Sequence, residues 1–124
     1  MSDILSIMHR RGWQTILTGN PYYQIIAEKR KLFMARKNRR LLVHAVATDE
    51  GWQYAQVQKD SIHQLQAMAS EQGGDDFTCV AVLVVNDMFT WLSEESIDSL
   101  PVTKEDDIEW VEIPISRFHP LALL

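Results

Sequence analysis

Apolar residues recur along the chain at two spacings, and these separate the expected helices from the expected strands. Residues 3–11 and 61–72 each carry apolar side chains three and four positions apart, which is the spacing of one buried helix face. Residues 77–86, FTCVAVLVVN, are apolar almost throughout, as in a strand that is covered on both faces. The pattern therefore predicts two amphipathic helices and one central strand.

Shorter stretches rich in β-branched and aromatic residues predict further strands. They are WQTIL (13–17), YYQIIAE (22–28), LFMAR (32–36), LLVHAVAT (41–48), MFTWL (88–92) and IEWVEIPI (108–115). We expect the last one at a sheet edge, because Pro114 has no N–H to donate. An alternative for residues 21–37 is one basic helix, since Asn20-Pro21 is also a good helix start.

The remaining segments are expected to connect or to cover the sheet. Residues 93–100 predict a short helix, VTKEDD (102–107) an acidic loop, and the tail HPLALL (119–124) an apolar segment that docks on something. The order of elements predicts a single α/β or α+β domain over residues 1–124. Its mixed central sheet of about five strands is flanked by helices.

Charge divides the chain into two parts. Residues 1–43 hold nine Lys or Arg and two acids, whereas residues 44–124 hold three bases and fifteen acids, for a net charge of −5. The single cysteine, Cys79, excludes a disulfide within the chain. We expect a cytoplasmic protein that does not enter a membrane, because no apolar segment is long enough to span one.

Five phrases in chain order carry a resemblance to a known superfamily. They are HRRGWQTILTG, YYQIIAEK, LLVHAV, SIHQLQAMASEQGG and TCVAVLVV. Over residues 3–92 the chain resembles the restriction-endonuclease-like, or PD-(D/E)xK, nucleases, and in particular their Holliday-junction-resolvase-like branch. The resemblance implies a restriction-endonuclease-like fold and, as in the resolvase-like relatives, a homodimer.

The chemistry of that superfamily depends on three side chains. An Asp and a Glu on adjacent strands hold a divalent metal, usually Mg²⁺, and a Lys helps it to activate water and stabilise the phosphate. The corresponding residues here are Gln24, His44 and Val46. An amide and an imidazole are poor replacements for carboxylates around Mg²⁺, and valine has no proton to donate. The resemblance therefore implies a degenerate catalytic site without a metal.

A displaced site is the alternative. Glu28 lies four residues after Gln24 and would face the same way on a strand, and Asp49 follows the strand that holds His44. Together with His44 they would suit a transition metal better than Mg²⁺. The simpler interpretation makes Glu28 a charged strand end. It makes His44 a partly buried imidazole that is hydrogen-bonded to Gln24 or to a backbone carbonyl.

The basic residues between the strands expected at 22–28 and 41–48 form the candidate nucleic-acid-binding surface. They are Lys29, Arg30, Lys31, Arg36, Lys37, Arg39 and Arg40. Such residues contact phosphates and supply affinity without reading the base sequence. The alternative is a solvated hairpin, or a patch that pairs with the acidic part of another copy.

The sequence thus favours a catalytically inactive nuclease-fold protein over an enzyme. It would act as a binding or scaffolding subunit that contacts nucleic acid through the basic hairpin, or a protein partner, without a cofactor. One alternative is a metal-dependent DNA endonuclease or resolvase with a displaced active site, which would use Mg²⁺ or Mn²⁺. A second alternative is a small α+β accessory or immunity factor with a different fold.

Overall fold

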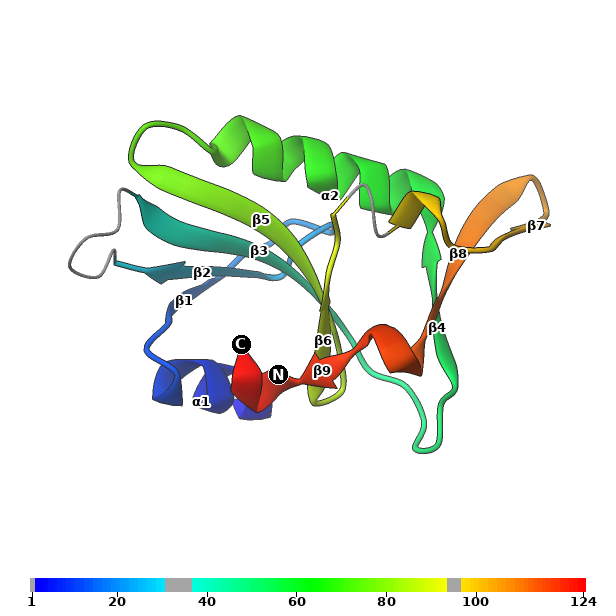
Figure 1. Cartoon of the computed structure of the whole chain (residues 1–124), viewed down its shortest axis with the longest axis horizontal. Helices are drawn as coiled ribbons and strands as arrows, with labels where there is room; N and C mark the ends of the chain where they lie inside the picture. The colour runs from blue at the N-terminus through cyan, green and yellow to red at the C-terminus, as the bar shows by residue number, and fades with distance from the viewer. Residues whose placement is uncertain (1, 31–36, 94–96) are drawn as a thin grey trace.

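The computed structural model describes residues 2–30, 37–93 and 97–124. Two β-sheets and the helices around them make up these segments (Figure 1). The elements are α1 (Ser2–Arg10), β1 (Gln14–Leu17), β2 (Ile25–Lys29), β3 (Asn38–Val46), β4 (Tyr54–Gln58), α2 (Lys59–Gln72), β5 (Phe77–Val85), β6 (Met88–Trp91), β7 (Val102–Glu105), β8 (Ile108–Pro114), β9 (His119–Pro120) and two 3-10 turns, η1 (Ile115–Arg117) and η2 (Leu121–Leu123).

The larger sheet has the strand order β1-β2-β3-β5-β6-β9. Strands β3 and β5 are parallel and pair over nine residues, and every other pairing in this sheet is antiparallel. A parallel pair needs a crossover connection, which β4 and α2 provide. The predicted mixed sheet flanked by helices is confirmed, with six strands in place of about five and a second sheet, β4-β8-β7, beside it.

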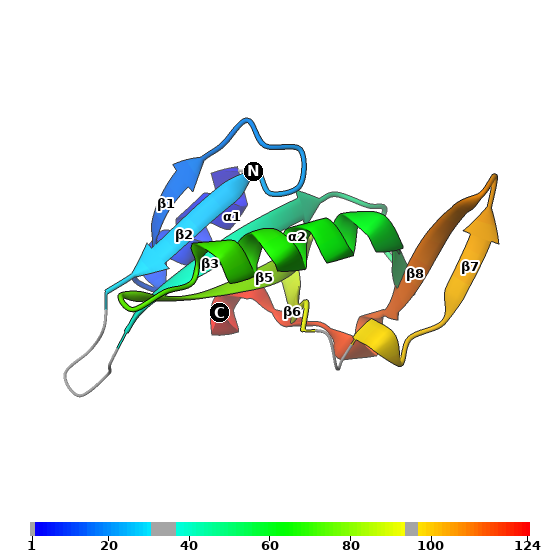
Figure 2. The ribbon, with the colours of Figure 1, turned by 90° about the horizontal axis from the view of Figure 1, so that it is seen from above.

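Alternating side chains of β3 and β5 supply two apolar layers, one on each face of the large sheet. Leu42 and Leu83 face the layer that α2 and the small sheet cover. Val43 and Val82 face the layer that α1 and the C-terminal tail cover. The period-2 alternation of a strand assigns the neighbouring residues to opposite faces. Figure 2 shows α2 lying along β3 and β5, with β1 and β2 to one side.

The stretch 21–37 contains a strand, so the alternative of one basic helix is wrong. Ile25 and Ala27 are fully buried and point to the α1 layer, whereas Ile26 points to the opposite face. A helix would not produce this alternation. The expected strand over residues 32–36 lies outside the described residues.

Two expectations for the C-terminal part are wrong. VTKEDD is not a loop, because Val102–Glu105 form β7 and Asp106 and Asp107 are its turn into β8, both with positive φ. Two positive φ values characterise a tight hairpin turn whose twist suits antiparallel strands. Strand β8 is not an edge strand, since it lies between β4 and β7. Pro114 is tolerated because it is the last residue of β8.

Other boundaries differ by smaller amounts. Helix α2 begins at Lys59, after Gln58, which makes no side-chain capping hydrogen bond, and it ends before Gly73 as expected. The short helix predicted for residues 93–100 is only partly described, with Ile97 and Asp98 helical and residues 94–96 outside the described part. Among the described residues, no helix is both long enough and apolar enough to cross a membrane.

The apolar tail docks on the chain's own sheet. Strand β9 pairs with β6, the Leu121 N–H donates to the Asp87 carbonyl at 2.8 Å, and the Trp13 indole N–H donates to the Leu124 backbone oxygen at 3.2 Å. Leu121 is 1% exposed and Leu124 is 6% exposed. The expected docking of the tail is therefore confirmed, and the surface on which it docks is the chain's own core.

The tail provides a matched pair of variants for stability. We expect Leu121→Ala to lower the free energy of unfolding by about 2–5 kcal/mol, because it leaves a cavity under α1. Leu123, which is 65% exposed, is the control, and Leu123→Ala should change it by less than about 0.5 kcal/mol. Urea unfolding measures both values, and equal losses would contradict the docking of the tail.

Candidate functional site

Gln24 and His44 lie side by side where β2 begins opposite β3. The Gln24 backbone N–H donates to the Val43 carbonyl at 3.0 Å, and its side-chain Oε1 accepts from the Ala45 N–H at 2.8 Å. Because a backbone N–H can only donate, this bond fixes which end of the amide is oxygen. The Nε2 end therefore points to the other side, 3.3 Å from the Pro21 carbonyl and 3.4 Å from His44 Nδ1.

His44 is held by a backbone carbonyl. Its Nδ1 lies 2.9 Å from the Tyr22 oxygen, which can only accept, so Nδ1 carries the proton and donates. The Gln24 amide nitrogen is also a donor, and its 3.4 Å approach to Nδ1 is then a contact rather than a hydrogen bond. The hydrogen-bonded imidazole expected from the sequence is confirmed, with the Tyr22 carbonyl as its partner.

The electrostatics of His44 favour the neutral ring. Burial lowers the pKa of His44 below its ordinary value of 6.5, and the hydrogen bond to the Tyr22 carbonyl partly opposes this shift. Val46, two residues later on the same face of β3, is half-buried and packs against the layer below α2. Gln24, His44 and Val46 thus present an amide, a neutral imidazole and an isopropyl group.

The residues considered for a displaced site are not brought together. Glu28 accepts from Arg40, with its Oε1 2.8 Å from Nη2 and 2.9 Å from Nε, at the opposite end of β2 from Gln24. Four residues of a strand span about 13 Å, so Glu28 does not reach His44. Asp49 lies in the exposed turn after β3. Within residues 2–30, 37–93 and 97–124, no three His, Cys, Asp or Glu side chains are placed to hold a metal ion.

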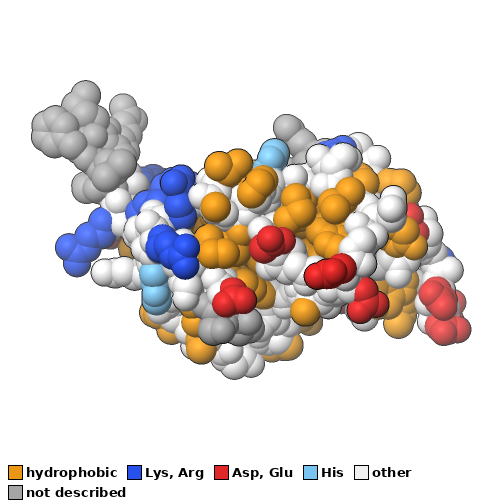
Figure 3. All heavy atoms as spheres, turned by 90° about the horizontal axis from the view of Figure 1, so that it is seen from below, with side chains coloured by type: hydrophobic (Ala, Val, Ile, Leu, Met, Phe, Trp, Pro, Cys, Tyr) orange, Lys and Arg blue, Asp and Glu red, His pale blue; other side chains and the backbone are white. Residues whose placement is uncertain are grey.

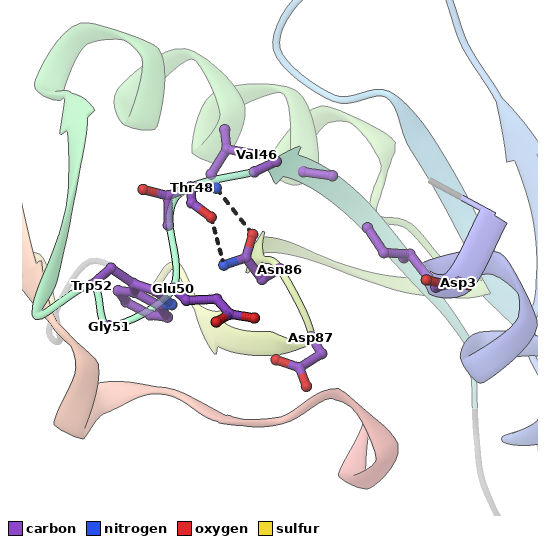
Figure 4. Close-up of a pocket in the computed structure, with 11 residues that line it drawn as sticks. Asp3, Val46, Thr48, Glu50, Gly51, Trp52, Asn86 and Asp87 are labelled. Atoms are coloured by element: carbon purple, nitrogen blue, oxygen red, sulfur yellow. Dashed lines mark hydrogen bonds between the residues drawn. The ribbon is translucent and has the colours of Figure 1, made fainter.

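A hollow of about 720 Å³ opens at the C-terminal ends of β3 and β5. Ala45 and Val46 line it together with Trp52, and Figure 4 shows the carboxylates of Glu50 and Asp87 near each other, with Asp3 across from them on α1. All three acids are exposed. Sequence reasoning did not find this hollow, because its lining comes from three segments that no local motif connects.

The loop around this hollow is held by a reciprocal side-chain contact. Asn86, at φ 55°, accepts from the Thr48 N–H at 3.0 Å and donates to the Thr48 carbonyl at 3.1 Å (Figure 4). Asparagine tolerates this left-handed conformation better than most residues. The carboxylates therefore stand on a fixed rim, and their charge attracts cations and repels a polyanion such as a phosphate backbone.

The basic residues lie at the other end of β2 and β3. Lys29 and Arg39 are directly opposite each other across the two strands. Lys29 Nζ lies 4.5 Å, and Arg39 Cζ 5.1 Å, from the ring centre of Trp13, which is 2% exposed. Burial lowers the pKa of Lys29, and the nearby charges of Arg39 and Arg11 lower it further. Lys29, Arg39 and Arg11 thus form one cationic cluster.

Arg40 is separate from that cluster. It faces the α2 side of the sheet, where it pairs with Glu28, lies 4.1 Å from the Phe77 ring centre and approaches the Gln72 carbonyl at 3.5 Å. Arg30 and Lys37 are exposed. The remaining two candidates, Lys31 and Arg36, lie outside the described residues. Figure 3 shows most of the visible Lys and Arg side chains at one end of the molecular face that it draws, and Asp and Glu over the middle and the other end.

The comparisons with known proteins define the fold. No protein-family model and no curated protein matches the sequence. A solved structure that is similar is that of Hjc, a Holliday junction resolvase from the hyperthermophilic archaeon Archaeoglobus fulgidus, with a TM-score of 0.59 and 15% sequence identity. The match covers 99% of this chain and 97% of that chain. The chain therefore has a restriction-endonuclease-like fold, as expected, and the alternative of an unrelated α+β fold is wrong.

The geometry of His44 predicts how stability depends on pH. Since the folded-state pKa lies below the unfolded value, the unfolded chain binds more protons as the pH falls below 6.5. The stabilising contribution is therefore present above that pH and is lost as the pH falls toward the folded-state pKa. Urea unfolding from about pH 7 to about pH 5 should show a steeper loss for the wild type than for His44→Gln. An equal loss of stability in the wild type and in His44→Gln would contradict a neutral, partly buried His44 ring in the folded state.

Proposed function

We propose that this chain is a nuclease-fold protein that has lost the metal-dependent reaction and serves as a non-catalytic binding subunit. The observation that carries the proposal is the network of Gln24 and His44. Gln24 accepts from the Ala45 N–H and donates to the Pro21 carbonyl, and His44 Nδ1 donates to the Tyr22 carbonyl. Neutral polar groups that are paired in this way are stable without a metal, whereas two apposed carboxylates need a cation.

The second line of support is the position of the charges. In an active nuclease, phosphate and metal must meet at the catalytic carboxylates. Here the end of β3 that carries His44 leads into a hollow bordered by Asp3, Glu50 and Asp87, and the cations are at the opposite end of the strand. Phosphates are therefore attracted away from the former catalytic position. This favours nucleic-acid contact without cleavage over the displaced-site alternative.

The partner we propose is nucleic acid, held by backbone phosphates. The charge pattern supports this class, and the resolvase of similar fold is named for a branched DNA substrate. Self-association is a separate expectation, and Leu121 and Leu124 of the tail would not contribute to it, because the chain itself covers them.

A cleavage assay tests the loss of chemistry. We expect no product from four-way junction, linear duplex or single-stranded DNA in Mg²⁺ or in Mn²⁺, because no carboxylates surround the former metal position. Product formation that disappears in Glu28→Ala or in His44→Ala would overturn the proposal and establish a displaced active site.

A metal-stability measurement tests the correspondence of Gln24 and His44 to the lost carboxylates. In EDTA, the variant Gln24→Asp/His44→Glu should be about 1–3 kcal/mol less stable than the wild type, because it loses paired donors and apposes two negative charges. Mg²⁺ at a hundred times its Kd would restore about 2.7 kcal/mol by binding the folded state. Thermal melting with and without Mg²⁺ provides the readout.

The control for this measurement is His44→Gln, which adds no carboxylate and should not respond to Mg²⁺. A wild-type response to Mg²⁺ would contradict the proposed absence of a metal site. A double variant that melts at the same temperature with and without Mg²⁺ would show that Gln24 and His44 do not occupy the two ligand positions.

A further inference from the structure

Three cations from separate parts of the sequence meet at the end of α1. Arg11 follows the last turn of the helix, and Lys29 and Arg39 are cross-strand neighbours on β2 and β3. Both strand residues face the α1 side and lie over the buried ring of Trp13. We call Arg11, Lys29 and Arg39 the Trp13 cluster.

Gly12 allows this approach. Its φ of 90° is in the left-handed region, and a Cβ there would lie 3.6 Å from Lys29 Cε. The glycine turns the chain sharply from α1 into β1 and places Trp13 beneath the two cations. The Trp13 backbone N–H donates to the Met8 carbonyl at 3.0 Å, and this hydrogen bond stabilises the turn.

The cluster has an electrostatic cost. Like charges directly opposite each other on paired strands are destabilising. Burial is the main cause of the lowered pKa of Lys29, and repulsion from Arg39 and Arg11 lowers it further. Among the described residues, the carboxylates that form ion pairs are Glu28, with Arg40, and Glu109, with Lys59, so none is paired with this cluster.

Covering Trp13 does not require this arrangement. One cation above the ring, or an apolar side chain, would shield the indole without the repulsion between like charges. A single cation–π contact already contributes about 0.5–2 kcal/mol. Three converging donors suit an anion with several oxygens, because guanidinium groups bind phosphate oxygens in a bidentate fork and an ammonium adds a point charge. A hollow of about 470 Å³ provides room for it. Its lining is Arg11, Gly12, Gln14, Glu28, Lys29 and Arg30, and the Glu28 carboxylate is already paired with Arg40.

We propose that Arg11, Lys29 and Arg39 form a phosphate-binding site that holds the backbone of a nucleic acid on the α1 side of the sheet. This site rests on the proposed function and specifies where and how the nucleic acid is held. Lys29 is five residues from Gln24, which on a strand is about 16 Å. The bound backbone therefore crosses the hairpin end of the sheet and stays clear of the acidic hollow around Glu50 and Asp87.

Salt-dependent binding to a short mixed-sequence DNA duplex tests the site. The slope of log K against log salt should fall by about 0.9 for each phosphate-contacting cation removed, in Arg11→Gln, Lys29→Gln and Arg39→Gln. Lys29→Arg keeps the charge and should keep the slope. Lys59, on α2, is paired with Glu109, and Lys59→Gln should also leave the slope unchanged. Circular dichroism verifies that each variant is folded.

A second readout follows Lys29 itself. A bound anion favours the charged ammonium, so the pKa of Lys29, followed by NMR with ¹³C-labelled lysine, should rise when duplex is added. A purely structural contact with Trp13 would leave it unchanged. Inorganic phosphate is the parallel arm, and it should give a smaller rise at the same phosphate concentration, because it lacks the neighbouring phosphates of a strand.

The outcomes separate this site from the proposed function. Duplex binding with unchanged slopes in all three Gln variants would overturn the site and leave nucleic-acid binding to other cations. The absence of any binding at low salt would overturn both. A response to inorganic phosphate without duplex binding would make the cluster a site for free phosphate and overturn the nucleic-acid assignment. Salt-sensitive self-association lost in Lys29→Gln would assign the cluster to the acidic end of a second copy, and would also overturn the site.

Discussion

The parallel pairing of β3 with β5 is the constraint on which the rest of the structure depends. The pair is the only parallel one among the described strands, and its central residues are buried on both faces. Neighbouring residues such as Leu42 and Val43 therefore serve different layers, one under α2 and one under α1. A shift of one residue in register would exchange the two layers and expose both. On its other edge β3 pairs antiparallel with β2, and that register places Arg39 opposite Lys29 and brings Gln24 beside His44.

The sequence predicts the elements that periodicity controls and misses those that pairing controls. Strand β5 and helix α2 were predictable because FTCVAVLVV and the spacing of Ile62, Leu65 and Ala69 show their burial directly. Strand β7 was not, because Val102–Glu105 is exposed throughout and is a strand through its pairing with β8. For the same reason Pro114 suggested an edge, although the proline only ends a central strand.

The candidate site, too, was predictable from the sequence only in part. The correspondence of Gln24, His44 and Val46 to two carboxylates and a lysine comes from the resemblance and stays a prediction. A backbone carbonyl as a partner for His44 was predicted from the sequence and is confirmed. The identity of that carbonyl, from Tyr22, was not visible, since it depends on how the chain turns before β2. Arg11 was missed because it precedes the basic stretch by eighteen positions, and only the fold of α1 onto β2 brings it to Lys29.

Charge is separated along β2 and β3, with Lys29 and Arg39 at one end and the acids of the hollow at the other. Metal-dependent phosphodiester cleavage needs the metal, a water and the phosphate within a few ångströms of each other. Lys29 and Arg39 favour a phosphate at the hairpin end, whereas the acids of the hollow disfavour one at the opposite end. A carboxylate introduced at Gln24 would add negative charge toward the acidic end. This separation of charge supports the proposal that the chain holds a nucleic acid without cutting it.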